Sequence, residues 1–391
     1  MSTQTEIEGW RLQLDRVLSL RYVLLATVSL AAAVFAGGRG DWNEFVAAGR
    51  SLLGRDGLNF FVRHGDVQTG PLSLILARLF AFTPRNGFVL CTIASAALGL
   101  VAIHCLEAAH KSTRGIDRRG TELTTLVGGI VVVFWWAKLG GYGHLDDALV
   151  LTAAAASVLL ASRDRRIVAA ALIGIAIATK PWAVIFLPLT FGSFGPLRAR
   201  LKPVMIAIAI GAAFWAPFVL AAPRTLSSLR PTVNVAADSV IRLFGFSSND
   251  APAWLRAAQL AGALAVAAIA MWRGRAGGVI LAAVAVRLAT DPGTWSYYTA
   301  GFVLGALAWD LIETDRVVPV MTLCATAALL PPWIVHSADL RALLRLSICV
   351  AAVVVVLSHA SKDVNAPARF RCPFRLRSER NSDVDTSELA R

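Results

Sequence analysis

Seven titratable or charged side chains in this sequence could do chemistry, and each lies within a few residues of the end of an apolar segment. They are four carboxylates, one imidazole and two cations: Asp41, His144, Asp146, Asp147, Lys180, Arg287 and Asp291. Cations at membrane depth need anionic partners or an anionic ligand. Loop solvation explains any single one of these residues as well as a function does, but the group as a whole predicts a polar site on one face of a membrane.

Asp41 directly follows the first apolar segment, in the stretch GRGDWNEFVAAGRSLLGRDGLNFF (38–61). A carboxylate at the lipid boundary is partly desolvated, which predicts a raised pKa and the capacity to take a proton from an acceptor hydroxyl. The structural alternative is an N-cap, because Asp41 precedes a helix expected to begin near Trp42 and Asp is favoured at that position. The two roles do not exclude each other, so Asp41 is the predicted catalytic base.

Two cations of the group are suited to a phosphate, Lys180 as a point charge and Arg287 through its planar guanidinium. The alternative is that both side chains extend to the phosphates of lipid headgroups. We predict that they bind the phosphate of a donor substrate.

Further residues on the same face could hold an acceptor or a sugar. The segment HLDD (144–147) could orient an acceptor or bind a metal ion, although capping of the span that begins at Asp147 is the simpler explanation, and we predict no metal site. Trp295, Tyr297 and Tyr298 fit an aromatic belt at a membrane interface, although aromatic rings also stack on sugars. The full set predicted to bind acceptor or sugar is Glu44, Arg50, His64, His144, Asp146, Asp147, Asp291, Trp295 and Tyr298.

The composition indicates that these residues are positioned by membrane helices. The chain has 391 residues, of which 56% are hydrophobic and 16% charged, and its mean hydropathy is +0.62. Open sheets leave backbone groups unpaired in lipid, so the predicted fold class is all-α, a polytopic bundle of about 12 transmembrane helices. No cleavage pattern of a signal peptide precedes the first apolar segment, which we expect to be retained. The predicted spans are 22–37, 87–107, 121–138, 147–162, 167–179, 182–194, 203–221, 252–272, 277–290, 295–311, 317–334 and 341–358.

The net charge of +13 would suit a nucleic-acid partner, but the distribution of charge argues against one. With the N-terminal segment 1–21 in the cytoplasm, most Lys and Arg residues lie in inside loops and tails, which is the ordinary bias of membrane proteins. The basic tail, 359–391, is predicted to be disordered and cytoplasmic, and could contact anionic lipid. The five cysteines show no spacing typical of a metal site or a disulfide framework.

The first outer loop, 38–86, is predicted to contain two juxtamembrane helices. In 42–53, one face carries Phe45, Val46, Gly49, Leu52 and Leu53, opposite Asn43, Glu44, Arg50 and Ser51, which is typical of a helix at a membrane surface. The segment 71–82 is apolar enough for a span, but counting it as one would move the basic loops 110–120 and 163–166 outside. We therefore expect it to be half-embedded at the outer face.

The first outer loop also resembles that of the GT-C superfamily of membrane glycosyltransferases, and is most similar to the polyprenyl-phosphate-mannose-dependent mannosyltransferases of actinobacteria. The resemblance rests on Asp41, Phe45, Gly49, Gly54 and Pro71-Leu72-Ser73. Three later stretches are also similar to that family: GYGHLDDALVL, ALIGIAIATKPWAVIFLPL and RLATDPGTWSYY. The resemblance therefore extends over roughly residues 20–310. The sequence departs from the family at Thr69-Gly70-Pro71, where Tyr-Pro-Pro is common.

The resemblance implies a reaction and a place for it. A sugar would pass from a polyprenyl-phosphate donor to a glycolipid or glycan acceptor, with inversion, on the outer face of the plasma membrane. Asp41 would deprotonate the acceptor, and Lys180 and Arg287 would stabilise the departing phosphate. The family is regarded as able to work without a tightly held metal, so no cofactor is expected. Both termini would be cytoplasmic.

Two other classes of function stay open. A transporter or lipid flippase would place polar groups near the bilayer midplane on broken helices, whereas the charges here gather at one face. A non-catalytic partner that keeps the fold is the second alternative. The donor sugar is also open, since mannose and arabinofuranose both suit the resemblance, with mannose preferred.

Overall fold

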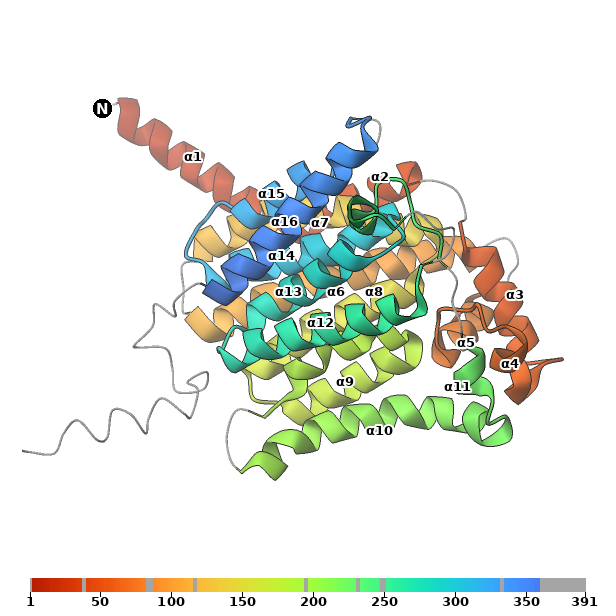
Figure 1. Cartoon of the computed structure of the whole chain (residues 1–391). Coiled ribbons are helices and arrows are strands. Elements are labelled where there is room, and N and C mark those ends of the chain that lie inside the picture. The colour runs from red at the N-terminus through yellow and green to blue at the C-terminus, as the bar shows by residue number, and fades with distance from the viewer. Residues whose placement is uncertain are drawn as a thin grey trace, which may run out of the picture.

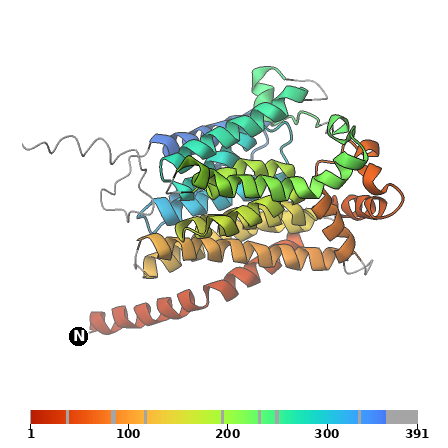
Figure 2. The same cartoon turned by 90° about the horizontal axis from the view of Figure 1, so that it is seen from below.

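The computed structural model describes residues 2–36, 40–81, 87–114, 118–192, 196–229, 233–246, 251–330 and 334–358. Within these residues every regular element is a helix, which confirms the predicted all-α class (Figure 1). The helices pack lengthwise against one another into one bundle, seen from two directions in Figures 1 and 2. The predicted basic tail, 359–391, lies outside the described residues.

Six helices are long and apolar enough to cross a membrane, judged by length and composition over the described residues. They are α6 (Gly87–Arg114), α7 (Arg118–Tyr142), α8 (Leu145–Ser162), α10 (Leu197–Ala221), α12 (Ala253–Trp272) and α16 (Ala338–Ser358). A bend of 60° separates α1 (Ser2–Ser19) from α2 (Arg21–Phe35), and this pair makes a seventh if it is one span. The chain therefore has the apolar helices of a membrane protein.

The other predicted spans also coincide with helices, but these are short. They are α9 (Arg166–Thr179), η2 (Pro181–Thr190), α13 (Ala276–Thr290), α14 (Thr299–Glu313) and α15 (Val320–Ala328). At about 1.5 Å per residue, none of them covers the roughly 30 Å of a hydrocarbon core. Of 15 residues each, 11 are buried in α13 and 14 in α14, and none is exposed, so these helices are surrounded by protein.

The break between α9 and η2 has a local cause. Lys180 is extended, with φ −151° and ψ 115°, and Pro181 follows it as the first residue of η2. Proline disfavours a helical conformation in the residue before it, so α9 ends there. Lys180 is thereby held in a short extended linker between two helices.

The predicted juxtamembrane helices lie together at one end of the bundle (Figure 1). They are α3 (Trp42–Leu52) and α5 (Pro71–Phe80), with η1 (Gly57–Asn59) and α4 (Phe60–Arg63) between them in the sequence. The short helix α11 (Thr225–Ser228) joins them, while α1 points away from the bundle at the opposite end (Figures 1 and 2).

The predicted apolar face of α3 packs on α5, with one exception. Gly49 allows the close approach, because a Cβ atom there would lie 2.3 Å from the carbonyl oxygen of Leu74. Phe45 and Val46 pack against buried apolar residues, while Glu44 and Arg50 are exposed. Leu53, the last member of the predicted apolar face, is the residue just after the helix and is 56% exposed, so protein leaves it uncovered.

Candidate functional site

Asp41 and His144 meet where the turn between α7 and α8 touches the start of α3. Gly143 has a left-handed backbone, φ 82°, and a Cβ atom there would lie 2.6 Å from that of Trp42. Only glycine suits both demands. The backbone N–H of Asp41 donates to Tyr142 O at 3.0 Å, and Asp41 Oδ2 lies 3.0 Å from His144 Nε2. Residues 103 positions apart are thus held together by backbone and side chain.

The carboxylate of Asp41 is oriented by His144. Asp41 occupies the N-cap position of α3, but its side chain makes no capping hydrogen bond, so the capping explanation is wrong for the side chain. Its side chain is 46% exposed, and within the described residues no hydrogen bond reaches Oδ1. Asp41 therefore presents one oxygen atom that is free to accept a proton.

The pKa of Asp41 is lowered, where the sequence predicted that it would be raised. The hydrogen bond from His144 lowers it below its usual value and outweighs the raising effect of partial burial. The sequence revealed the position at an apolar boundary but not the partner. Asp41 consequently stays ionised at neutral pH, as a base must.

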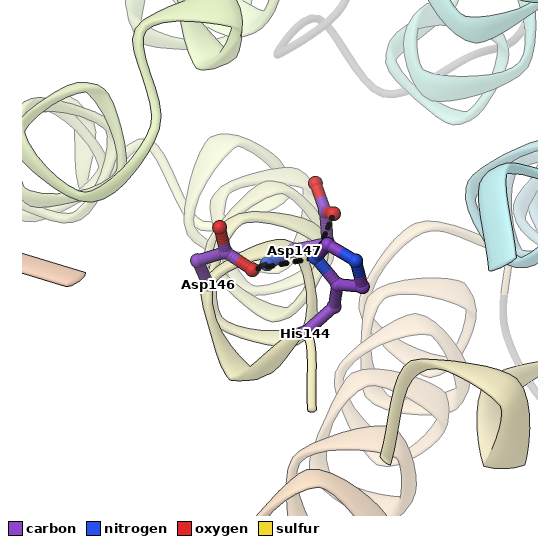
Figure 3. A group of neighbouring side chains, drawn as sticks. All are labelled: His144, Asp146 and Asp147. Atoms are coloured by element: carbon purple, nitrogen blue, oxygen red, sulfur yellow. Dashed lines mark hydrogen bonds and ion pairs between the residues drawn. The ribbon is translucent and has the colours of Figure 1, made fainter. Parts of the chain in front are cut away.

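His144 is buried between aromatic rings and carboxylates. Its ring stacks on Tyr297 with centroids 3.9 Å apart, and the Phe45 ring lies edge-to-face with it at a centroid distance of 5.3 Å. Its Nδ1 lies 3.3 Å from Asp146 Oδ1 and 3.5 Å from Asp147 Oδ2 (Figure 3). Burial lowers the pKa of His144, but the hydrogen bonds to Asp146 and Asp41 outweigh burial and raise it above its usual value. An imidazole that faces carboxylates with both nitrogens donates from both when protonated.

Lys180 is the common partner of the two buried aspartates. Its Nζ lies 2.9 Å from Asp146 Oδ2 and 2.7 Å from Asp147 Oδ2. Thr69 Oγ1 donates to Asp146 Oδ2 at 3.0 Å, and Trp182 Nε1 donates to Asp147 Oδ1 at 3.0 Å. Lys180 is only 7% exposed, so in this arrangement its charge serves the aspartates and is not presented to a ligand.

His144, Asp146 and Asp147 have the ligand types of a metal site, and their ligand atoms all lie within 4.8 Å of one another. The ammonium of Lys180, however, contacts oxygens of both aspartates. A divalent ion would have to displace this ammonium and compete with a salt bridge already in place. We therefore treat the group as a His–Asp–Asp–Lys cluster and derive no metal chemistry from it.

Arg287 keeps its hydrogen-bonding capacity. Its guanidinium carbon lies 4.0 Å from the ring centroid of Trp182 and 4.9 Å from that of Tyr298. Its nearest carboxylate oxygen is Asp291 Oδ2, 3.9 Å from Nε, and no hydrogen bond from its guanidinium is found in the part of the chain that the structure describes. Of the two cations predicted to bind phosphate, Arg287 is therefore the one with donors to offer.

Asp291 is the buried centre of a neighbouring group. It accepts hydrogen bonds from Arg256 Nη1 at 3.1 Å, Gln259 Nε2 at 3.3 Å and the backbone N–H of Gly293 at 3.0 Å. Arg256 and Gln259 were not predicted. A signal was present, since they are polar residues three positions apart, one helical turn, near the start of the otherwise apolar α12.

A second aspartate continues this group toward α16. Asp238 accepts from Thr294 Oγ1 at 2.5 Å and Arg341 Nε at 3.0 Å, and Arg345 Nη2 lies 3.8 Å away. Asp238 lies just before η3 (Val240–Phe244), and Ser239 Oγ next to it donates to Asp291 O at 2.8 Å. The hydrogen bond from Ser239 thus connects the backbone beside Asp238 to the backbone of Asp291.

The remaining predicted site residues lie outside these groups. Glu44 and Arg50 are exposed on α3, and Trp295 is 56% exposed. His64 Nε2 contacts Asp56 Oδ2 at 2.9 Å in a separate cluster with Ser51 and Arg63 that joins the end of α3 to α4. Tyr297, predicted as part of an interface belt, is buried against His144, so the belt explanation is wrong for it.

Comparison with protein families, curated proteins and solved structures finds no match for this chain. The resemblance of its first outer loop to GT-C glycosyltransferases therefore stays a prediction.

Proposed function

We propose that this chain is an integral membrane glycosyltransferase that moves a sugar from a polyprenyl-phosphate donor to a lipid or glycan hydroxyl, with inversion. The observation that carries the proposal is the half-exposed carboxylate of Asp41, whose Oδ2 lies 3.0 Å from the buried His144 and whose Oδ1 accepts no hydrogen bond from the described residues. Such a group is suited to accept a proton from a hydroxyl that reaches the end of the bundle.

In the proposed reaction, each of these residues has a role. The acceptor hydroxyl gives its proton to Asp41 while its oxygen forms the new bond to the anomeric carbon. The bond from that carbon to the phosphate oxygen breaks, and the electron pair leaves with the phosphate. Arg287, whose guanidinium is stacked on Trp182 and makes no hydrogen bond within the described residues, offers charge-assisted hydrogen bonds to the departing phosphate. Lys180 positions Asp146 and Asp147 behind His144.

The proposal also includes how the chain crosses the membrane. The chain would cross the plasma membrane about 12 times in a GT-C-like bundle, with the short α9, η2, α13, α14 and α15 among the crossings. The end that carries α3 and α5 would face outside, and both termini would lie in the cytoplasm. Mannose is the preferred donor sugar, with arabinofuranose as the alternative.

A transporter or flippase is the second candidate, but the site favours a transferase. Asp41 precedes α3, His144 precedes α8 and Lys180 follows α9, so these charges lie where helices begin and end. A transport site requires its polar groups near the midplane, on broken helices. Of these three residues, Lys180 alone lies at a break within an apolar stretch.

Transfer by the purified protein tests the proposal. The protein in liposomes would receive radiolabelled polyprenyl-phosphate mannose, or the arabinofuranose donor in parallel, with bacterial membrane lipids as acceptor. We expect label to enter lipid or glycan with the wild type and not with Asp41→Asn. The matched control is Asp66→Asn, which removes an exposed carboxylate of the same loop and should leave transfer unchanged. Equal transfer by wild type and Asp41→Asn would remove Asp41 as the base, and no transfer with verified donor and acceptor pools would favour the transporter or the non-catalytic partner.

A further inference from the structure

The group around Asp238 and Asp291 carries more positive charge than it neutralises. We call it the arginine group. Its four cations come from α12, α13 and α16, and its two anions from the segments before η3 and after α13: Arg256, Arg287, Arg341, Arg345, Asp238 and Asp291. Four guanidinium groups against two carboxylates leave a formal charge of +2. The four arginine side chains are between 12% and 24% exposed, so the excess positive charge is held largely out of water.

Several guanidinium nitrogens of the arginine group have no hydrogen-bond partner among the residues that the structure describes. Arg256 Nη2 and Arg345 Nε are buried without a hydrogen bond in the described part of the chain. Arg287 adds a guanidinium that is stacked but not hydrogen-bonded. Buried donors without acceptors are unfavourable and rare, and an anion with several oxygens would satisfy them.

The two aspartates cannot supply what is missing. Asp291 already accepts from Arg256 Nη1, Gln259 and Gly293, and Asp238 accepts from Thr294 and Arg341. Both are held by these contacts and by the hydrogen bond of Ser239 to the backbone of Asp291. The arginines are therefore oriented by fixed anions, with unused donors remaining.

We propose that the arginine group is a phosphate-binding site, and that its charge is matched to a phosphate monoester. The carrier of the phosphate rests on the proposed function. A polyprenyl-phosphate donor is a phosphodiester with one negative charge, and the polyprenyl phosphate left after transfer is a monoester with about 1.5 to 2 negative charges at pH 7. A site with a formal charge of +2 binds the monoester more tightly than the diester. It thereby favours the charge that develops as the bond to phosphate breaks.

Binding measured without turnover tests this site. The purified full-length protein would bind radiolabelled farnesyl phosphate in detergent, with farnesyl methyl phosphate, phosphatidylglycerol and inorganic phosphate as competitors. We expect farnesyl phosphate to bind about tenfold or more tightly than its methyl diester, which has the same chain and one charge fewer. Inorganic phosphate and phosphatidylglycerol should compete only weakly.

Variants locate the site. Arg256→Gln and Arg345→Gln should each weaken farnesyl phosphate binding about tenfold or more, as the loss of a charge-assisted hydrogen bond to phosphate requires. Arg242→Gln removes an exposed arginine of η3 and should leave binding within about twofold. Arg256→Lys keeps the charge and loses the planar fork, so an intermediate loss in a protein that keeps its thermal midpoint separates binding from folding.

Each contrary result would overturn a different part of the proposal. Unchanged binding in Arg256→Gln and Arg345→Gln, or an equal loss in Arg242→Gln, overturns the site. Equal affinity for the monoester and the diester overturns the charge match. Phosphatidylglycerol competing as well as farnesyl phosphate would assign the site to lipid headgroups, and inorganic phosphate doing so would assign it to free phosphate. Because no acceptor is present, failure of this site and failure of glycosyl transfer are separate observations.

Discussion

The two charged groups at the end of the bundle differ in which sign is in excess. In the His–Asp–Asp–Lys cluster with Asp41, three carboxylates share one lysine and one imidazole. In the arginine group, four guanidinium groups share two carboxylates. A proton acceptor needs the first environment, and a departing anion needs the second.

Trp182 contacts both groups. Its indole N–H donates to Asp147 of the His–Asp–Asp–Lys cluster, and its ring centroid lies 4.0 Å from the guanidinium carbon of Arg287 in the arginine group. One aromatic side chain therefore links an acidic residue of the first group to a basic residue of the second. One end of the bundle thus holds two groups of opposite net charge, each with its own internal ion pairs.

The largest expected effect comes from Asp41→Asn. Loss of a general base typically lowers a rate by about 10²- to 10⁴-fold. Since Asp41 lies outside the arginine group, the affinity for farnesyl phosphate should not change. Single-turnover transfer and equilibrium binding, measured on the same preparation, check both halves of the expectation. A parallel loss of binding would mean that the two groups are not functionally separate.

Next in size is the effect of Lys180→Met on stability. Removing the ammonium leaves Asp146 and Asp147 buried without their common partner, and breaking a buried ion pair costs about 3–5 kcal/mol. Thermal unfolding in detergent measures the loss, with the exposed Lys202→Met as the control. If the midpoint stayed at that of the control, the arrangement of Lys180 between the aspartates would be wrong.

Arg287→Gln should act on the donor alone. The change removes the guanidinium that is stacked on Trp182 and Tyr298, and we expect kcat/KM for the donor to fall about tenfold. Because the guanidinium is proposed to face the charge that develops on the departing phosphate, kcat should fall as well. Initial rates over a range of donor concentrations give both numbers, and Arg242→Gln serves as the comparison. An unchanged kcat/KM would remove Arg287 from the phosphate.

The smallest effect is a shift in pH dependence caused by His144→Gln. His144 lowers the pKa of Asp41, so the ionised base persists below the usual pKa of a carboxyl group. Without the imidazole the pKa of Asp41 rises, and activity should be lost at a higher pH as the solution is acidified. Transfer rates between pH 3.5 and 8 show the acidic limb, which should stay in place for Asp66→Asn. An acidic limb that does not move in His144→Gln would remove His144 as the group that tunes Asp41.

Much of the fold could be predicted from apolar runs, because each run marks a helix whatever its tertiary neighbours are. All twelve predicted spans overlap a helix, but the number that are long enough could not be predicted. Composition does not distinguish a helix that contacts lipid from one, such as α13, that is surrounded by protein. Both kinds are rich in Ala, Val and Leu.

The site could be predicted as a set of residues but not as a set of pairs. Asp41, His144, Asp146, Asp147 and Lys180 come together as expected from their common position at helix ends. Their pairing was hidden, because residue type does not reveal which cation faces which carboxylate across 33 or more positions.

The site residues that the sequence did not predict were missed for other reasons. Thr69 and Trp182 act through single hydrogen bonds that no spacing indicates. Arg341 and Arg345 fall within a predicted span, where their charge was counted as part of the helix and not of the site.

The shortness of α13 and α14 sets the depth at which chemistry would occur. Each has 15 residues and is therefore about 22 Å long, roughly 8 Å less than the hydrocarbon core of a typical bilayer. Under the proposed topology, the turn that joins them, which carries Asp291 and Tyr297, would lie below the level of the surrounding headgroups. A substrate tethered to a lipid tail would then reach the carboxylates without leaving the membrane, and water-soluble sugars would be at a disadvantage.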